Sequence, residues 1–183
     1  VHQASGVSWD GYWSETLRTR VSGEAKSIHD EPMYADSASR GIWVIAYGGS
    51  TTLMVFKAEV FAKFSPNDYF ASALVFNSSK NSLTGQRIPY VPDVEVSASY
   101  THDFPFGLSL TGDLTFLRGQ IDNVVNPSSL NGAMLLDFRA EYRILSPLKA
   151  FLELKNLTNM RYELWKGYQA FPLTMAVGLA AVW

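Results

Sequence analysis

The sequence lacks several features that would assign it to common protein classes. It contains no cysteine, so disulfide bonds, thiolate zinc sites and cysteine nucleophiles are excluded. No apolar run reaches about 18 residues, which excludes a transmembrane helix. The 15 basic and 17 acidic side chains nearly cancel, which leaves no electrostatic footprint for nucleic acid. Glycine-rich nucleotide-binding motifs are absent as well.

Charge is scarce, whereas apolar residues are abundant but never continuous. Charged residues make up 17% of the chain, and a soluble domain carries about 25%. Hydrophobic residues make up 47%. A chain that is apolar on average but interrupted everywhere is typical of a transmembrane β-barrel, whose strands show lipid every second residue. The sequence begins at Val1 without a signal-peptide pattern, so we expect a mature form or a piece of a longer protein.

Alternation with a period of two is clearest between Met134 and Ile144. One face of this stretch is apolar and consists of Met134, Leu136, Phe138, Ala140, Tyr142 and Ile144. The other face carries Leu135, Asp137, Arg139, Glu141 and Arg143. A helix would scatter these charges around its circumference, so the pattern predicts a strand.

Similar alternation predicts further strands, several of them roughly 9 to 12 residues long, as a tilted strand needs to cross a bilayer. These strands are expected at residues 7–21, 40–47, 52–64, 67–78, 94–101, 108–116, 149–155 and 175–183. Phe61 and Phe151 interrupt the pattern, because each stands on a face that otherwise carries charge.

The predicted connections alternate in length. Short turns rich in Pro, Asn, Asp, Ser and Gly are expected at 65–68, 102–107 and 145–148, and long loops at 77–93, 118–132 and 156–174. Short turns on one side and long loops on the other are typical of outer-membrane barrels. The sequence therefore predicts an all-β, antiparallel up-and-down transmembrane β-barrel segment of about eight or nine strands over residues 1–183.

Residues 1–50 fit this prediction least well. With 7–21 as one strand and 22–39 as a loop on the short-turn side, the strand count is odd. Bacterial single-chain barrels have even counts. We therefore expect either a different first hairpin or an incomplete barrel.

The last predicted strand ends on an aromatic residue. One of its faces carries Met175, Val177, Leu179, Ala181 and Trp183, and the other carries small residues. This arrangement is similar to the C-terminal signal that the barrel-assembly machinery reads. Trp183 also suits the aromatic belt at a membrane interface, and the two roles are compatible.

From Thr51 onward the sequence resembles the C-terminal part of TonB-dependent outer-membrane receptors. Three stretches carry the resemblance in the family's order and spacing: 85–92, 135–143 and 152–163, followed by Gly167, Tyr168 and Pro172. The chain departs from the family at residues 171–174, where Pro-Gly-Arg is common, and at Trp183, where Phe is usual.

The resemblance implies a 22-stranded barrel with an N-terminal plug in the bacterial outer membrane. It further implies a transport protein and not an enzyme, importing a scarce ligand such as a ferric siderophore or cobalamin with energy from the TonB complex. No cofactor is expected. About nine strands cannot close such a barrel and would leave two edges unpaired, so a fragment or a chain completed by another polypeptide fits best.

Two groups of side chains are candidate functional residues. Charges expected to face the lumen, either as a hydrated wall of paired charges or as contacts to a plug or substrate, are Asp137, Arg139, Glu141, Arg143, Glu153 and Lys155. Aromatic residues of the last long loop that would contact a ligand or form an interfacial girdle are Tyr162, Trp165, Tyr168 and Phe171.

The histidines predict neither a metal site nor catalysis. His2, His29 and His102 have no partner at metal-ligand spacing. No nucleophile motif accompanies His102 and Asp103, so we expect these two to be solvated turn residues.

Two other classes of protein remain open on the sequence alone. One is a small self-contained outer-membrane barrel of eight or ten strands with a structural, adhesive or lipid-modifying role. The other is a soluble all-β binding module. The gene segment before Val1 would separate the first from a receptor, and behaviour without detergent would separate the second.

Overall fold

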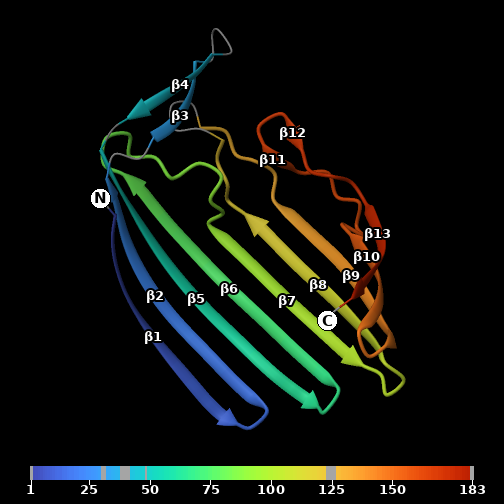
Figure 1. The fold of residues 1–183 in the computed structure, drawn as a ribbon. Coiled ribbons are helices and arrows are strands. Elements are labelled where there is room, and N and C mark those ends of the chain that lie inside the picture. Colours follow the sequence, from blue (N-terminus) through green and yellow to red (C-terminus); the bar gives the residue numbers. More distant parts are fainter. Residues whose placement is uncertain (1, 30–31, 38–41, 48, 123–126, 182–183) are drawn as a thin grey trace.

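The computed structural model describes residues 2–29, 32–37, 42–47, 49–122 and 127–181. Nine antiparallel strands form one curved sheet in the order β1-β2-β5-β6-β7-β8-β9-β10-β13 (Figure 1). Their bounds are β1 His2–Ser14, β2 Leu17–His29, β5 Ser50–Ser65, β6 Asp68–Asn81, β7 Val94–Asp103, β8 Leu108–Arg118, β9 Ala133–Leu145, β10 Leu148–Lys155 and β13 Thr174–Ala181. No helix among these residues has the length and apolarity that a membrane crossing requires.

Two small hairpins lie at the long-loop end of the sheet (Figure 1). In the connection from β2 to β5, β3 (Pro32–Ser37) pairs with β4 (Ile42–Tyr47). In the connection from β10 to β13, β11 (Glu163–Trp165) pairs with β12 (Tyr168–Gln169). The predicted short turns lie at the opposite end of the sheet, so connection length separates the two ends as expected.

The register places nearly all strand charges on one side of the sheet, which we call the polar face. Across strands, Arg20 lies opposite Glu59, and Arg139 lies opposite both Thr111 and Glu153. The intervening residues point to the other side, which we call the apolar face. The charged residues of the nine strands that belong to the apolar face lie at strand ends: Asp68, Lys80 and Arg118.

Large side chains on the apolar face are exposed, because none of the described elements of the chain packs on that face of the sheet. Met175 is 70% exposed, Val177 71% and Met54 58%. The buried hydrophobic side chains among the described residues are only Ile121, Leu130 and Ala133. A water-soluble domain buries one face of each sheet against a second layer, whereas a membrane barrel leaves it to lipid.

The first 50 residues differ from the sequence-based expectation. Residues 7–21 are not one strand, since β1 and β2 form a hairpin around Glu15 and Thr16. A two-residue turn and a register shift between Tyr12 and Ser14 keep odd-numbered residues on the apolar face in both strands. The alternation therefore passes through the turn unbroken, and the turn contains no Gly, Pro or Asn that would have marked it.

This hairpin corrects the side of the sheet on which the first long connection lies. Residues 22–29 belong to β2 and not to a loop, so the connection from β2 to β5 lies on the long-loop side. The strand expected at 40–47 is β4, which pairs with β3 and does not join the large sheet. Residues 40 and 41 lie outside the described residues. The sheet still has nine strands, because β1 and β2 replace the two strands that were expected there.

The final strand, β13, places four residues of the expected assembly signal on the apolar face. Met175, Val177, Leu179 and Ala181 of β13 lie on the apolar face, opposite Leu154, Leu152, Ala150 and Leu148 of β10. Trp183 lies outside the described residues, so its part in an assembly signal stays a prediction.

Candidate functional site

The buried polar side chains gather at the long-loop end of the sheet. Among the described residues they are Thr51, Asn81, Asp122 and Asn156, each 5% exposed or less. Asn81 ends β6, Asp122 lies in the loop after β8, and Asn156 follows β10 directly. Since a buried polar group is costly unless it is hydrogen-bonded, these residues mark where the long loops are held.

Asn81 anchors the loop from β6 to β7 (82–93). Its Oδ1 accepts hydrogen bonds from the backbone N of Leu83 at 2.9 Å and of Thr84 at 2.9 Å. Its Nδ2 donates to Thr51 Oγ1 at 3.1 Å. The loop is thus turned back at its first residues and tied to the start of β5, in the way that an Asx turn forms.

Asn156 anchors the loop from β10 to β13 (156–173). Its Oδ1 accepts from the backbone N of Met160 at 2.9 Å, and its Nδ2 donates to the carbonyls of Met160 at 2.9 Å and Phe171 at 3.2 Å. Its own backbone N donates to Asp137 Oδ1 at 2.7 Å. The backbone φ of Asn156 is 54°, a left-handed conformation that asparagine tolerates better than most residues. The side chain of Asn156 therefore joins the two ends of this loop, and its backbone N attaches them to the polar face.

Asp122 joins two long loops to each other. Its carboxylate accepts from the backbone N and the hydroxyl of Ser128, both at 2.7 Å, within the loop from β8 to β9. It also accepts from Lys166 Nζ at 2.9 Å, next to the β11–β12 hairpin. Nearby, the Tyr90 and Trp165 rings meet with centroids 4.5 Å apart.

Backbone contacts bring the third loop into the same place. Tyr90 N donates to the Ile121 carbonyl at 2.9 Å, and Gln120 Nε2 donates to the Tyr90 carbonyl at 3.1 Å. The three long loops therefore meet at Tyr90, Ile121, Asp122, Trp165 and Lys166, which we call the loop junction. Burial raises the pKa of the Tyr90 hydroxyl, so this residue is a neutral phenol at ordinary pH.

The loop junction should depend on pH. Burial raises the pKa of Asp122, but hydrogen bonds from Ser128 and Lys166 outweigh it and lower the pKa from 3.8 to about 2. Because the pKa of Asp122 in the folded protein lies below its value in the unfolded chain, the carboxylate stabilises the junction above about pH 4. This contribution, about 2 kcal/mol, is lost as the pH falls toward 2.

Limited proteolysis and hydrogen exchange of residues 119–122 and 163–169 between pH 5 and pH 2 measure this effect. Protection should fall with the pH in the parent protein, and Asp122→Asn should lower protection at pH 5 and flatten the profile. A matched control is Asp103→Asn, which changes a carboxylate at the short-turn end of the sheet. An Asp122→Asn profile as steep as the parent's would contradict the assignment.

The structure separates the four aromatic residues expected to form one ligand-contacting group. Trp165 is part of the loop junction, and Tyr168 lies opposite it in the β11–β12 register. Tyr168 is 70% exposed and Phe171 is 81% exposed. Within the described chain, none of the four rings, Tyr162 included, makes a ring contact with another of the four. Their contact with a ligand stays a prediction.

The expected lumen charges all lie on the polar face, where most are paired. Glu141 is shared by Arg139 at 2.5 Å and Lys149 at 3.4 Å, and Lys155 pairs with Glu153 at 3.3 Å. Asp137 is engaged by the backbone of Asn156. Such pairing is what a hydrated wall needs. Arg143, the sixth of these charges, makes no ion pair with any residue that the structure describes, and neither does Asp113 of the same face.

The aromatic exceptions on the polar face lie beneath arginines. The Arg139 guanidinium is 5.9 Å from the centroid of Phe151, and the Arg18 guanidinium is 5.9 Å from that of Phe61. Arg18 also pairs with Asp10 at 2.8 Å. Opposite Phe151 stands Gly178, where a Cβ would lie 2.6 Å from the ring, so a larger residue there would displace the ring. These rings are therefore cation–π partners in a polar wall.

His102 is not a solvated turn residue, contrary to expectation. It belongs to β7, and its Nδ1 donates to Asp68 Oδ1 at 2.6 Å, an oxygen that the Tyr100 hydroxyl also approaches at 2.5 Å. Its ring also meets Phe104 edge-on, with centroids 4.3 Å apart. In the described ranges, no group of three or more His, Asp or Glu side chains is arranged to hold a metal ion.

The loop anchors were not predicted from the sequence, although a signal was present. Asn81 and Asn156 each stand at the end of an alternating stretch and are followed within three residues by a threonine, in Asn-Ser-Leu-Thr and Asn-Leu-Thr. Asparagine at such a position favours an Asx turn. The meeting of the three loops had no sequence signal, because it joins residues more than 30 positions apart.

Comparison with known proteins finds matches in structure but none in sequence. No protein-family model matches the chain, and no curated protein matches it in sequence. Solved structures do match 98% of it. They include a mutant of the ferric enterobactin receptor PfeA from Pseudomonas aeruginosa (TM-score 0.79, 14% identity), the siderophore receptor PirA from Acinetobacter baumannii (0.77, 9%) and the copper transporter OprC (0.76, 16%).

The match is to part of each neighbour. The chain spans 31% of PfeA, 32% of PirA and 31% of OprC. At these identities the likeness shows the fold. The chain has the fold of the barrel portion of TonB-dependent outer-membrane receptors.

Proposed function

We propose that this chain is part of the barrel wall of a bacterial outer-membrane receptor that imports a metal ion or a metal complex. The observation that carries the proposal is the separation of strand charges onto one face of a nine-stranded sheet, with exposed apolar side chains on the other. A wall of this kind places its apolar face against lipid and its polar face around a lumen.

The class of cargo is inferred from the neighbours in structure. Their names describe receptors for ferric enterobactin and siderophores and a transporter for copper. We infer that a metal-bearing ligand is captured at the long-loop end, where the loop junction holds three loops together. The exposed Trp165, Tyr168 and Phe171 supply apolar contact area there.

The polar face would meet the plug domain of the receptor. Uptake would be energised by the TonB complex through a plug domain inside the barrel. Asp113 and Arg143 are suited to meet groups of such a plug, because neither has an ion-pair partner among the described residues. Surrounding lipid would cover the apolar face, and the barrel-assembly machinery would read β13 with its terminal residues.

Cysteine labelling tests the orientation of the wall, because the sequence has no cysteine of its own. Leu136→Cys lies on the apolar face of β9, and Thr111→Cys lies on the polar face of β8. A water-soluble maleimide should label the Thr111→Cys protein at least ~10-fold faster in intact membranes, since the reactive thiolate forms in water and not in hydrocarbon.

Equal labelling rates at the two positions would contradict a membrane wall. They would favour the soluble binding module instead, which should also stay monodisperse without detergent. The denatured variants serve as controls, since both thiols must then react at the same rate.

Uptake by cells tests the transport role itself. Deleting the gene should abolish accumulation of one radiolabelled ferric siderophore or of copper, and dissipating the proton gradient in the parent strain should do the same. If accumulation of every metal complex is unchanged, the transport role is wrong and a small structural or adhesive barrel is favoured.

A further inference from the structure

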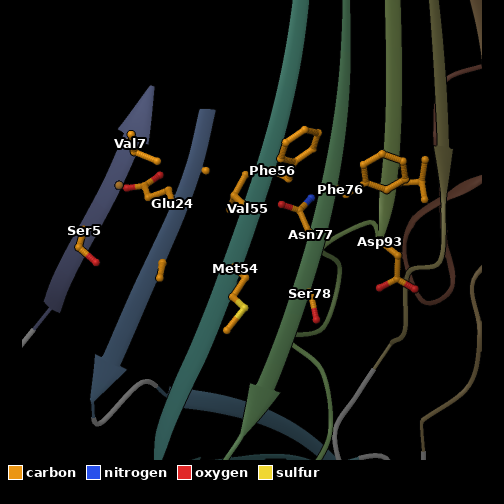
Figure 2. A pocket seen from close by; sticks show the side chains of 14 residues that line it. Ser5, Val7, Glu24, Met54, Val55, Phe56, Phe76, Asn77, Ser78 and Asp93 are labelled. Atoms are coloured by element: carbon orange, nitrogen blue, oxygen red, sulfur yellow. The ribbon is translucent and has the colours of Figure 1, made fainter. Parts of the chain in front are cut away.

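The apolar face is hollowed toward the long-loop end of β1, β2, β5 and β6. The hollow measures about 840 Å³ (Figure 2). Val7, Gly23, Phe56 and Phe76 lie in one row across the four strands. A Cβ at Gly23 would meet no atom within 4 Å, so the glycine leaves a gap between Val7 and the Phe56 and Phe76 rings, whose centroids are 6.4 Å apart.

A second hollow adjoins the first on the side nearer the long loops. It measures about 390 Å³, and the residues lining it are mostly hydroxyl-bearing: Ser50, Thr52, Met54, Ser78, Ser79, Lys80 and Ser82. Met54 and Ser78 line both hollows. Together the two form one groove, apolar at one end and polar at the other, which we call the amphipathic groove.

Charge at the groove favours an anion. Lys80 lies opposite Thr52 in the second hollow and makes no ion pair within the described part of the chain. Two acidic residues line the first hollow, and both are neutralised. Glu24 belongs by register to the polar face and pairs with Lys26 at 3.0 Å, and Asp93 contacts Arg87.

We propose that the amphipathic groove binds one anionic, phosphate-bearing lipid of the surrounding membrane, with its phosphate at Lys80 and an acyl chain over Gly23. The Gly23 row lies four residues along the strands from the Lys80 row, a rise of about 13 Å. This span suits an acyl chain that begins at a headgroup held by Lys80 and neighbouring hydroxyls. The proposal rests on the proposed function, because lipid reaches this face only if the sheet lies in a membrane.

Native mass spectrometry of the full-length protein in detergent tests the site with two lipids of equal chain length. Dilauroyl phosphatidylglycerol carries a net negative charge, and dilauroyl phosphatidylcholine does not. Lys80→Gln should weaken retention of the phosphatidylglycerol by about tenfold and leave the phosphatidylcholine unchanged. Gly23→Leu should weaken retention of both lipids, since the side chain fills the gap that the acyl chain occupies.

The chain offers a matched control for each variant. Arg118→Gln removes another cation at the loop end of the apolar face. Gly112→Leu fills another open glycine on that face, between Tyr100 and Phe138. Both controls should retain phosphatidylglycerol as the parent does. If Gly23→Leu fails to fold, Gly23→Ala should still give a smaller loss for both lipids.

The outcomes separate this proposal from the proposed function. Retention that falls equally in Lys80→Gln and Arg118→Gln, or in neither, overturns the lipid site. Heat-modifiable gel mobility and metal uptake of the same variants report on insertion and transport. If these are normal while retention is unchanged, the lipid site alone is wrong; if the parent does not insert, the proposed function is wrong as well.

Discussion

Replacing Phe138 with arginine is expected to destabilise the sheet in a membrane. Phe138 lies near the middle of β9 on the apolar face, between Gly112 and Leu154 of the adjacent strands. A cation at the midplane of a barrel's lipid face costs about 2–4 kcal/mol. Phe138→Arg should therefore lower the free energy of unfolding in lipid vesicles by about that amount, measured by urea titration of tryptophan fluorescence.

Ser99→Arg is the matched control on the polar face. Ser99 lies opposite Asp113, which has no ion-pair partner among the described residues. The new cation gains a carboxylate neighbour there, so stability should be unchanged or slightly higher. If both variants destabilise the protein equally, the assignment of the two faces is wrong.

Replacing Asn156 with alanine should release the long loop after β10. The change leaves the carbonyls of Met160 and Phe171 and the backbone N of Met160 without their partners. It also places a Cβ-bearing residue without a polar side chain at φ 54°. Together these effects should lower the free energy of local opening by about 3 kcal/mol, measured by hydrogen exchange over residues 157–173.

Two variants separate the contributions at Asn156. Asn156→Gly removes the hydrogen bonds without the backbone strain, so it should be less damaging than alanine by about 1 kcal/mol. Asn159→Ala has a similar left-handed backbone, φ 49°, but its Oδ1 accepts only from Leu173 N at 3.2 Å, so its effect should be the smallest. Equal effects at Asn156 and Asn159 would show that Asn156 is not the anchor.

The strands of the large sheet from β5 onward were predictable because their outer-facing side chains are not buried against other parts of the chain. When one face meets lipid and the other meets water, polarity alternates without regard to contacts elsewhere in the chain. Lys57, Glu59 and Lys63 on β5 show this, as do Asp137, Arg139 and Glu141 on β9. The turn at Glu15 and Thr16 keeps odd-numbered residues on the apolar face of both β1 and β2. The same alternation therefore predicted a single strand at 7–21 where the structure has a hairpin.

The loop end was not predictable in the same way, because its order depends on single hydrogen bonds between distant segments. Nothing near Lys166 in the sequence indicates that it bonds Asp122, 44 positions earlier. The aromatic residues of the last loop were expected together because they are close in sequence. Among the described residues only Trp165 of these four has a ring partner, and that partner, Tyr90, belongs to a different loop.

The asparagine anchors make the loops after β6 and β10 transferable units. Asn81 bonds the first residues of its loop, and Asn156 bonds both ends of the loop that follows it. Residues between Met160 and Phe171 can then be lengthened, shortened or exchanged without disturbing the attachment to the sheet. A wall built in this way can acquire new recognition surfaces by grafting whole loops, while its strands stay unaltered.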